Sequence, residues 1–410
     1  MADADAIVIG SGHNGLVAAF CLAQAGWRVV VIERAAKIGG AVRTESVTLP
    51  GFRHDLYATN LSLFTGSRFY RDHRVELESA GLRFITCHEA FASAYQNDRS
   101  VRITTHAEQT DAEFAQCSAS DREGWRRLVS IFRRVAPHVL PFTSMPLASA
   151  QAAAQALRML VGLRGGVLEL RHVIFGSSRQ LVDRFFRTEE AKGALLPWAF
   201  HLDFGPDVKG GAAFAFLAAV SAHLNGLVVA QGGADAIATA LRRLIEDRGG
   251  IICTATEVTE VLVEDGRAVG VRTAGGDILS AARAVIANVT PWAGVKEAFA
   301  DRIVAQLEEH APGARDLILA RHVMSPDDFE GENPNLIGGD CVSGSHHLDQ
   351  NYLARPFPGW TRYRTPVERL FMVGASTWPG GGVNAASGYL VAAELLRDTS
   401  KKARQRGVEG

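Results

Sequence analysis

The sequence has little excess charge of either sign. Its 410 residues include 43 Lys and Arg and 44 Asp and Glu, which gives a formal net charge of -1. A protein that binds nucleic acid or an anionic surface electrostatically carries a basic surplus, and this chain has none. We therefore expect no nucleic-acid partner. A chain of this length is also expected to divide into two lobes.

Cysteine is scarce, and no two cysteines stand close enough to suggest a shared role. The five cysteines are widely scattered, with no C-x-x-C pair for disulfide exchange or zinc binding. We expect them to be reduced and, with no export signal visible after Met1, we predict a cytoplasmic protein. The most apolar stretch, 212–230, contains His223 and Asn225, which favours a buried helix over a transmembrane span. A peripheral contact with a membrane stays open.

Motifs of the commonest hydrolases, NTPases and metalloenzymes are missing. The chain has no G-x-S-x-G elbow, no Walker loop and no H-E-x-x-H. His346, His347 and Asp349 are metal-like in composition, but adjacent histidines in a strand point to opposite faces. His201 with Asp203 is set aside as well, so we predict no metal site.

The chain does contain a glycine motif in a strand–turn–helix setting. An apolar strand at 6–9 leads into Gly10-Ser-Gly-His-Asn-Gly15, followed by a helical pattern over 16–25 and a strand at 29–32. These glycines permit a tight turn, close approach of the backbone to a pyrophosphate, and close packing of helix and strand. The helix N-terminus supplies amide groups to the anion. Glu33, after the second strand, can accept hydrogen bonds from an adenosine ribose, so the segment predicts a dinucleotide site.

The segment after Glu33 favours FAD over NAD. Gly39 and Gly40 would keep the chain close to the ligand, and Arg43 can approach the phosphates. FAD needs such additional contacts because it extends further from the first turn than its adenosine half. The absence of a second G-x-G-x-x-G argues against an integral NAD(P)H domain, so we expect oxygen or a quinone as the electron acceptor.

The remaining chain alternates between a helical middle and further strand–helix segments. The pattern over 107–230 is largely helical, and its stretch 124–135 is amphipathic, with four arginines on the polar side. Further elements are predicted as follows: a helix at 236–247, strands at 250–254, 258–263, 268–273, 284–287 and 370–373, and a last helix at 386–397.

Taken together, these segments resemble the phytoene desaturase-like flavoproteins. The closest likeness is to the branch with carotene ketolases and pyridine nucleotide-disulphide oxidoreductase domain-containing proteins. It rests on Gly10–Val17, Glu33 and Gly39-Gly40, on 232–263, and on 347–351, Arg355-Pro356 and 370–383.

The resemblance implies an α/β fold with a Rossmann-type, glutathione-reductase-like FAD-binding domain and a discontinuous, helix-rich α+β substrate domain. We expect the FAD domain to comprise 1–91, 231–291 and 365–400, and the substrate domain 92–230 and 292–364. The residues expected to bind FAD are Gly10, Gly12, His13, Asn14, Gly15, Glu33, Arg34, Gly39, Gly40, Ala41, Arg43, Thr44, Val258, Gly374, Ala375, Gly381, Gly382, Val383 and Asn384.

The resemblance also implies an oxidoreductase that transfers electrons from C–H bonds of a small apolar substrate, isoprenoid or carotenoid-like, to flavin. Asp55 and Tyr57 match the family's segment that passes the flavin and are candidate catalytic residues, although an ordinary polar turn with a packed tyrosine explains them as well. Two other functions stay open: a flavin amine oxidase on the same fold, and a flavin-binding protein with impaired catalysis.

One departure from the family pattern is large. In the family, the strand corresponding to 284–287 leads into several further strands of the substrate domain. Here Asn288-Val-Thr-Pro291 runs directly into Trp292 and a helical pattern. We therefore expect a shortened substrate domain at 290–292, with fewer strands and a more open face toward the flavin.

Overall fold

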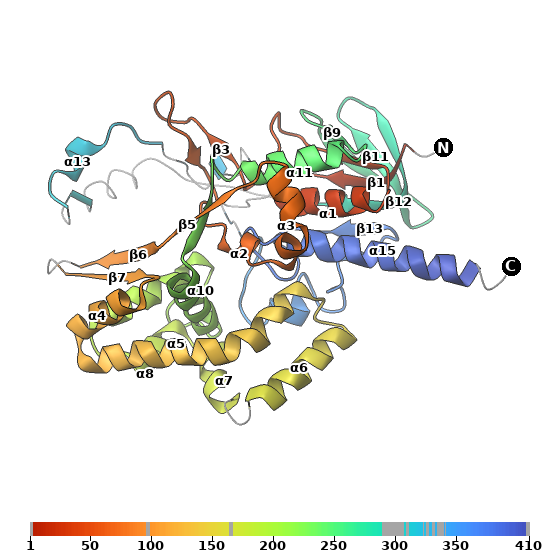
Figure 1. Ribbon diagram of the computed structural model, residues 1–410. Coiled ribbons are helices and arrows are strands. Elements are labelled where there is room, and N and C mark those ends of the chain that lie inside the picture. The colour runs from red at the N-terminus through yellow and green to blue at the C-terminus, as the bar shows by residue number, and fades with distance from the viewer. Residues whose placement is uncertain are drawn as a thin grey trace.

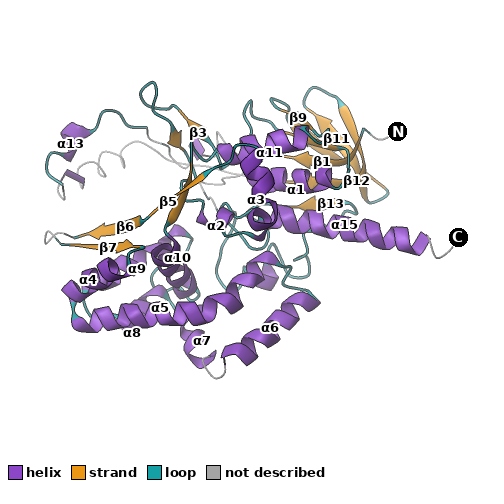
Figure 2. Ribbon diagram, in the orientation of Figure 1, coloured by secondary structure: helices purple, strands orange, loops and turns teal. Residues whose placement is uncertain are grey.

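The centre of the molecule is a seven-stranded sheet covered by helices (Figures 1 and 2). The computed structural model describes residues 3–95, 99–163, 167–288 and 342–406, together with short pieces between 307 and 340. In the sheet the strand order is β10-β11-β12-β1-β2-β9, and β13 also pairs with β12. The strands of this sheet are β1 (Ala4–Ile9), β2 (Val29–Ile32), β9 (Ile251–Cys253), β10 (Val258–Glu264), β11 (Arg267–Thr273), β12 (Ile278–Ala287) and β13 (Leu370–Met372).

Strand β12 joins a parallel half of the sheet to an antiparallel hairpin. Its first residues pair antiparallel with β11, and its last residues pair parallel with both β1 and β13. Strands β1, β2 and β9 continue the parallel half. Because parallel strands end at the same edge, the segments after β1, β2, β12 and β13 come together there although they are far apart in sequence.

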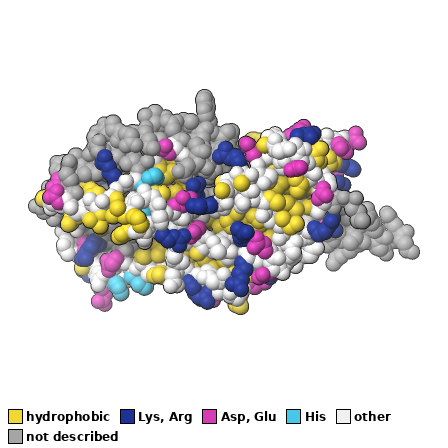
Figure 3. All heavy atoms as spheres, turned by 90° about the horizontal axis from the view of Figure 1, so that it is seen from above, with side chains coloured by type: hydrophobic (Ala, Val, Ile, Leu, Met, Phe, Trp, Pro, Cys, Tyr) yellow, Lys and Arg dark blue, Asp and Glu magenta, His cyan; other side chains and the backbone are white. Residues whose placement is uncertain are grey.

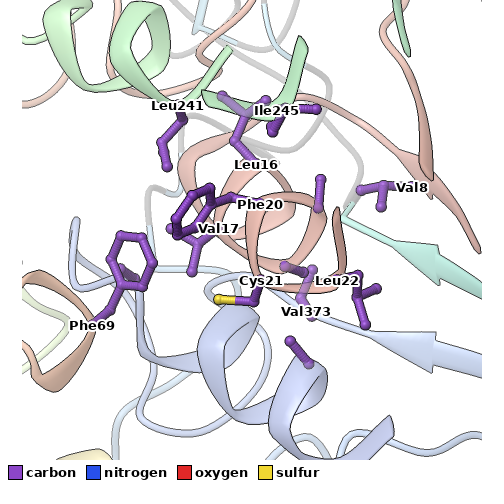
Figure 4. Close-up of a cluster of buried hydrophobic side chains, with 14 of the residues drawn as sticks. Val8, Leu16, Val17, Phe20, Cys21, Leu22, Phe69, Leu241, Ile245 and Val373 are labelled. Atoms are coloured by element: carbon purple, nitrogen blue, oxygen red, sulfur yellow. The ribbon is translucent and has the colours of Figure 1, made fainter. Parts of the chain in front are cut away.

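The parallel strands are apolar on both faces, as expected of a sheet covered on both sides. Val29 and Val31 pack with helix α1 (His13–Gln24), whereas Val30 and Ile32 face the β10–β11 hairpin. Figure 4 shows Leu16, Val17 and Phe20 of α1 within the larger of these two cores. That core also receives α3 (Arg68–Ser79), α11 (Ala236–Glu246) and α15 (Ala386–Arg406).

A third core, the helical core, lies among the helices of the middle segment, which gather to one side of the molecule in Figure 1. Helix α5 (Ala119–Val139) buries Trp125, Leu128 and Phe132 there, while its four predicted surface arginines are exposed. The other helices of this segment are α4 (Ala107–Cys117), α6 (Ala150–Leu163), α7 (Val167–Phe175), α8 (Ser178–Phe185), α9 (Glu189–Leu195) and α10 (Gly211–Asn225), with 3-10 turns η1 (Leu140–Ser144) and η2 (Leu196–His201).

Strands are few around the helical core in the described part of the chain. Two small antiparallel sheets are formed by β5 (Phe84–Cys87) with β8 (Leu227–Ala230) and by β6 (Glu89–Ala94) with β7 (Ser100–Thr104). The remaining short elements are β3 (Thr44–Glu45), β4 (His54–Asp55), α2 (Ser62–Thr65), α13 (Ala314–Leu317) and η4 (Tyr352–Ala354). The expected shortening at 290–292 lies outside the described residues.

Most elements predicted from the sequence are confirmed, with corrections at their ends. The strand predicted at 284–287 begins at Ile278, because its first residues continue the hairpin ladder with β11. The apolar stretch 212–230 is not one helix, since α10 ends at Asn225 before Gly226 and β8 follows. The last helix continues to Arg406 rather than ending near 397.

The three cores draw on different parts of the chain. The cores on the two faces of the large sheet draw on residues 4–82, 230–286 and 363–395, and the helical core draws on residues 101–220. We therefore keep the division into an FAD-binding domain and a substrate domain, hereafter the sheet lobe and the helical lobe, as a proposal.

The surface bears out the balanced charge of the sequence on the face seen in Figure 3, where basic and acidic side chains are interspersed. Within the described residues, no helix combines the length and apolar composition needed to cross a bilayer.

The N- and C-terminal segments of the chain come into close contact where α15 crosses α1. A Cβ atom on Gly388 would lie 2.0 Å from the Asn14 carbonyl oxygen, a distance at which something must shift. The Gly388 amide lies 3.5 Å from the Asn14 side-chain oxygen. Glycine at 388 therefore allows the backbones of the two helices to come into contact.

We predict that Gly388→Ala destabilises the protein by about 2 kcal/mol, as overpacking of a tight contact does. Alanine normally stabilises a helix relative to glycine, so the sign of the change separates the steric contact from helix propensity. Thermal unfolding checks this. Gly275→Ala is the control, because the nearest atoms to its added Cβ would lie at 3.7 Å. Equal or higher stability of Gly388→Ala would contradict the steric argument.

Candidate functional site

The glycine turn between β1 and α1 packs closely against Ile32 and Asn288. Gly10 has a φ of 90° and its amide donates to the Ile32 carbonyl at 2.8 Å. A Cβ on Gly12 would lie 2.6 Å from the side-chain nitrogen of Asn288. Helix α1 has no side-chain cap and no acid in its first turn, so its N-terminus keeps its partial positive charge for an anion.

Glu33 lies beside this turn, as the sequence predicts. One carboxylate oxygen accepts from the Ser11 amide at 2.8 Å and from the Ser11 hydroxyl at 2.7 Å, and the other accepts from the Ala35 amide at 2.8 Å. A carboxylate has about four acceptor positions, so capacity for a ribose hydroxyl remains. The Glu33 carbonyl accepts from Thr256, which brings the start of β10, with Val258, to this end of the site.

The Gly-Gly pair packs against the first turn. The Gly39 amide donates to the Ser11 carbonyl at 3.2 Å, and a Cβ on Gly40 would lie 3.0 Å from the Gly12 Cα. The other residues expected in this segment differ in placement. Arg43 is ion-paired with Glu45 at 2.5 Å, Arg34 is exposed, Ala41 is half-buried and Thr44 is buried.

The C-terminal loop and the start of α15 are tied to the first turn. The Gly374 amide donates to the Ser387 hydroxyl at 3.0 Å. Asn384 donates to the carbonyls of Gly380 and Gly382, both at 3.2 Å, and its side-chain oxygen accepts from the Ala386 amide at 2.9 Å. Asn384 therefore closes the glycine turn 380–382 and caps α15, while Val383 is buried beside it.

Two histidines contact the 380–382 turn, and burial makes both of them poor bases. Asn14 donates to Nε2 of His13 at 3.1 Å. Burial lowers the pKa of His13 to about 4, although a hydrogen bond to the Gly382 carbonyl favours the charged form. Nε2 of His346 accepts from the Gly381 amide at 3.3 Å. Burial and the nearby Arg355 lower the pKa of His346 to about 4 as well.

Three residues near the site were not among those predicted to bind FAD or to act in catalysis: Asn288, His346 and Arg355. Asn288 follows β12, and its place after a buried strand parallel to β1 is a signal that could have found it. Arg355 is 2% exposed and donates to the carbonyls of Ala375, Ser345 and Val342 at 2.6–2.8 Å. No sequence pattern indicates these carbonyl contacts, because they depend on the path of the loops.

The two candidate catalytic residues have structural contacts. The Asp55 carboxylate accepts from the Thr44 hydroxyl at 2.6 Å and from the Ala234 amide at 2.8 Å, which holds the β3–β4 hairpin against the start of α11. Tyr57 packs against Phe329 with ring centroids 5.4 Å apart. Both residues thus have the contacts of a polar turn with a packed tyrosine, and their catalytic role stays a prediction.

The histidine pair lies differently from the arrangement assumed in the sequence analysis. Residues 345–347 form no strand, and both rings lie near one carboxylate, with Asp203 oxygens 4.0 Å from His346 Nδ1 and 3.4 Å from His347 Nε2. The argument from opposite strand faces was therefore wrong. Among the described residues, no group of three or more His, Cys, Asp or Glu side chains is arranged to hold a metal ion.

Comparison with known families agrees with this geometry. The family model described as flavin containing amine oxidoreductase matches residues 15–306, which is more than half of the chain. The chain belongs to this family. It is therefore an oxidoreductase of the FAD-dependent superfamily that includes amine oxidases and phytoene desaturases.

Curated relatives are distant. Pyridine nucleotide-disulfide oxidoreductase domain-containing protein 2 of Rattus norvegicus is 24% identical over 547 residues, covering 96% of this chain and 93% of the relative. The neurosporene-forming phytoene desaturase of Cereibacter sphaeroides is 30% identical over 289 residues, covering 68% of this chain and 52% of the relative. The matched region thus spans about half of that desaturase.

Solved structures support the fold alone. Putrescine oxidase bound to putrescine aligns with a TM-score of 0.60 at 16% identity, covering 96% of this chain and 99% of that chain. The predicted α/β fold with a Rossmann-type sheet is confirmed by this similarity and by the sheet order.

Burial of His13 has a consequence for stability below neutral pH. Its pKa is about 4 in the fold and about 6.5 in the unfolded chain. Between these values the unfolded state binds a proton that the folded state does not, so stability falls as the pH drops from about 6.5 to about 4. From pH 7 to pH 5 one such group contributes a loss of about 2 kcal/mol.

We predict that His13→Gln makes the stability of the protein less dependent on pH between 7 and 5. Thermal midpoints of cofactor-free protein at pH 7, 6 and 5 measure this, and the exposed His172→Gln serves as the control. A wild-type midpoint that falls no more steeply than that of His13→Gln would show that His13 is not held neutral by burial.

Proposed function

We propose that the sheet lobe binds FAD non-covalently at the common edge of β1, β2, β12 and β13. The first turn and the N-terminus of α1 would receive the diphosphate, and Glu33 would receive the adenosine ribose. Gly39 and Gly40 would lie along the diphosphate, Val258 beside the adenine, and Gly374 and Ala375 along the ribityl chain. The 380–384 turn would lie against the flavin ring.

The described residues fit this cofactor. The first turn is lined by positions where a Cβ would collide with neighbouring atoms, namely Gly10, Gly12 and Gly374, and all three surround Asn288. These glycines leave room for Asn288, and the uncapped N-terminus of α1 beside them suits a diphosphate, because its first amides have no side-chain acceptor. Arg43 would need to leave Glu45 to reach a phosphate, so we assign it a secondary role.

We further propose that the enzyme oxidises C–H bonds of an apolar, isoprenoid-like substrate, with oxygen or a quinone as electron acceptor. When bound, the flavin supplies the redox chemistry, and the protein supplies binding, orientation and exclusion of water. The similarity to a phytoene desaturase supports this substrate class.

The observation that carries the proposal is the neutral and largely apolar surrounding of the 380–382 turn. A Cβ on Gly382 would lie 2.8 Å from the Leu63 side chain, and one on Gly381 would lie 3.0 Å from Val342. In the described part of the chain, the titratable side chains that contact the turn are His13 and His346, and because burial lowers the pKa of each to about 4, both are neutral at pH 7. Such surroundings suit an uncharged hydrocarbon better than a protonated amine.

We also propose that part of the substrate domain is missing and that turnover is therefore slow. The alignment with the rat relative runs over 547 residues although this chain has 410, so the relative carries residues without a counterpart here. An open face would admit water beside the flavin and weaken the exclusion of side reactions. A partner chain that closes this face would restore turnover.

The first functional prediction is that purified protein releases FAD on denaturation. Glu33→Gln should weaken FAD binding about tenfold, because a charged acceptor is lost, and Glu33→Arg should weaken it further. Titration of cofactor-free protein by flavin fluorescence measures this. Glu246→Gln on α11, where the exposed carboxylate pairs with Arg242, is the control. Release of NAD or FMN instead of FAD would refute the cofactor assignment.

The second functional prediction concerns the substrate. Under anaerobic conditions, a detergent-dispersed isoprenoid hydrocarbon such as phytoene should bleach the flavin absorbance slowly, and putrescine should not bleach it. Dithionite provides full reduction as the reference. Rapid bleaching by an amine would favour the amine oxidase function, and bleaching by dithionite alone would favour the impaired-catalysis alternative.

A further inference from the structure

A loop of residues 342–347, in the second segment of the helical lobe, lies between Asp203 and the glycine turn 380–382. On one side it is held by Asp203, which follows η2. The Asp203 carboxylate accepts from the Ser345 hydroxyl at 2.5 Å and from the His346 amide at 2.9 Å. Burial opposes ionisation of Asp203, but these hydrogen bonds outweigh it and keep the pKa of its carboxyl below the usual range.

The same loop is held on its other side by the buried Arg355. Its guanidinium donates to the Ser345 carbonyl at 2.8 Å and to the Val342 carbonyl at 2.6 Å. It also donates to Ala375, in the loop after β13, at 2.6 Å. The rigid fork of arginine suits this task, because several donors fix the relative positions of three carbonyls. Asp203 and Arg355 thus hold the loop from two sides.

From this loop the His346 side chain reaches the glycine turn. Its Nε2 accepts from the Gly381 amide at 3.3 Å, and a Cβ on Gly380 would lie 2.4 Å from the same atom. The residue is 5% exposed, and within the described part of the chain its Nδ1 has no hydrogen-bond partner. Because Nε2 accepts a hydrogen bond, the neutral ring carries its proton on Nδ1, 4.0 Å from the Asp203 carboxylate.

We propose that His346 is a positioning residue for the Gly380–Gly382 turn and that Asp203 holds this histidine in place through its backbone amide. The inference rests on the proposed function, in which this turn lies against the flavin ring. The contact chain Asp203, His346, Gly381 then links the position of the helical lobe to the shape of the flavin-facing turn. His346 acts through the turn and is not itself a catalytic residue.

Substitutions at position 346 that keep or remove an acceptor test the hydrogen bond between the Gly381 amide and His346. Glutamine places an oxygen near the position of Nε2 and can accept from Gly381, whereas leucine has no acceptor. We expect His346→Leu to weaken FAD binding about tenfold, the cost of one amide left without an acceptor. His346→Gln should stay within about threefold of wild type, and His172→Gln, at an exposed position on α7, should leave affinity unchanged.

The measurements are FAD titration of cofactor-free protein and visible circular dichroism of the bound flavin, which responds to the turn beside the ring. Asp203→Asn should alter the dichroism in the same direction as His346→Leu, with a smaller change. If the leucine variant does not fold, His346→Asn replaces it, because its shorter amide cannot reach Gly381. Equal affinity and equal dichroism for wild type, His346→Gln and the leucine or asparagine variant would overturn the proposal.

Failure of this inference is distinguishable from failure of the proposed function. If wild-type protein binds no FAD, the function proposed above is wrong and the positioning role falls with it. If wild-type protein binds FAD but the position 346 variants do not differ from it, the cofactor assignment stands and only the role of His346 is refuted.

Discussion

The contact on which the rest of the structure depends is the crossing of α1 and α15 at Asn14 and Gly388. The absence of a side chain at 388 lets the two helix backbones meet, and this fixes the C-terminal segment against the first turn of the chain. Ser387 and Asn384 extend the contact, since one holds the Gly374 loop and the other closes the 380–382 turn. Residues separated by most of the sequence thereby share one site.

The parallel strands of the large sheet place this helix crossing at the edge where the candidate site lies. The strands β1, β2, β12 and β13 all end at one edge, so the turns that follow them converge there. The N-terminus of α1 lies at the same edge, where it can stabilise a diphosphate. Asn288 occupies the centre of this group because it is the residue with which β12 leaves the sheet.

The two lobes meet through polar contacts near the glycine turn. Arg355, which with Asp203 holds the 342–347 loop of the helical lobe, donates to the Ala375 carbonyl of the sheet lobe at 2.6 Å. The Trp378 indole donates to the Phe142 carbonyl of η1 at 3.3 Å. Buried polar groups of this kind are costly unless satisfied, so they favour one relative placement of the lobes. A shortened substrate domain would make these contacts more important, because fewer strands would remain to join the lobes.

The sequence by itself determined most of the sheet lobe and the flavin-dependent family to which the chain belongs. Alternating and continuous apolar runs specify β1, β2, β10 and β11, and the glycine motif specifies the tight turn between β1 and α1, because both signals are local in the chain. Only the tertiary structure decided the positions of Asn288, His346 and Arg355, whose contacts arise from segments distant in sequence. The tertiary structure also decided that Asp55 joins the β3–β4 hairpin to the start of α11. The sequence alone does not show whether a carboxylate contacts a substrate or a backbone amide.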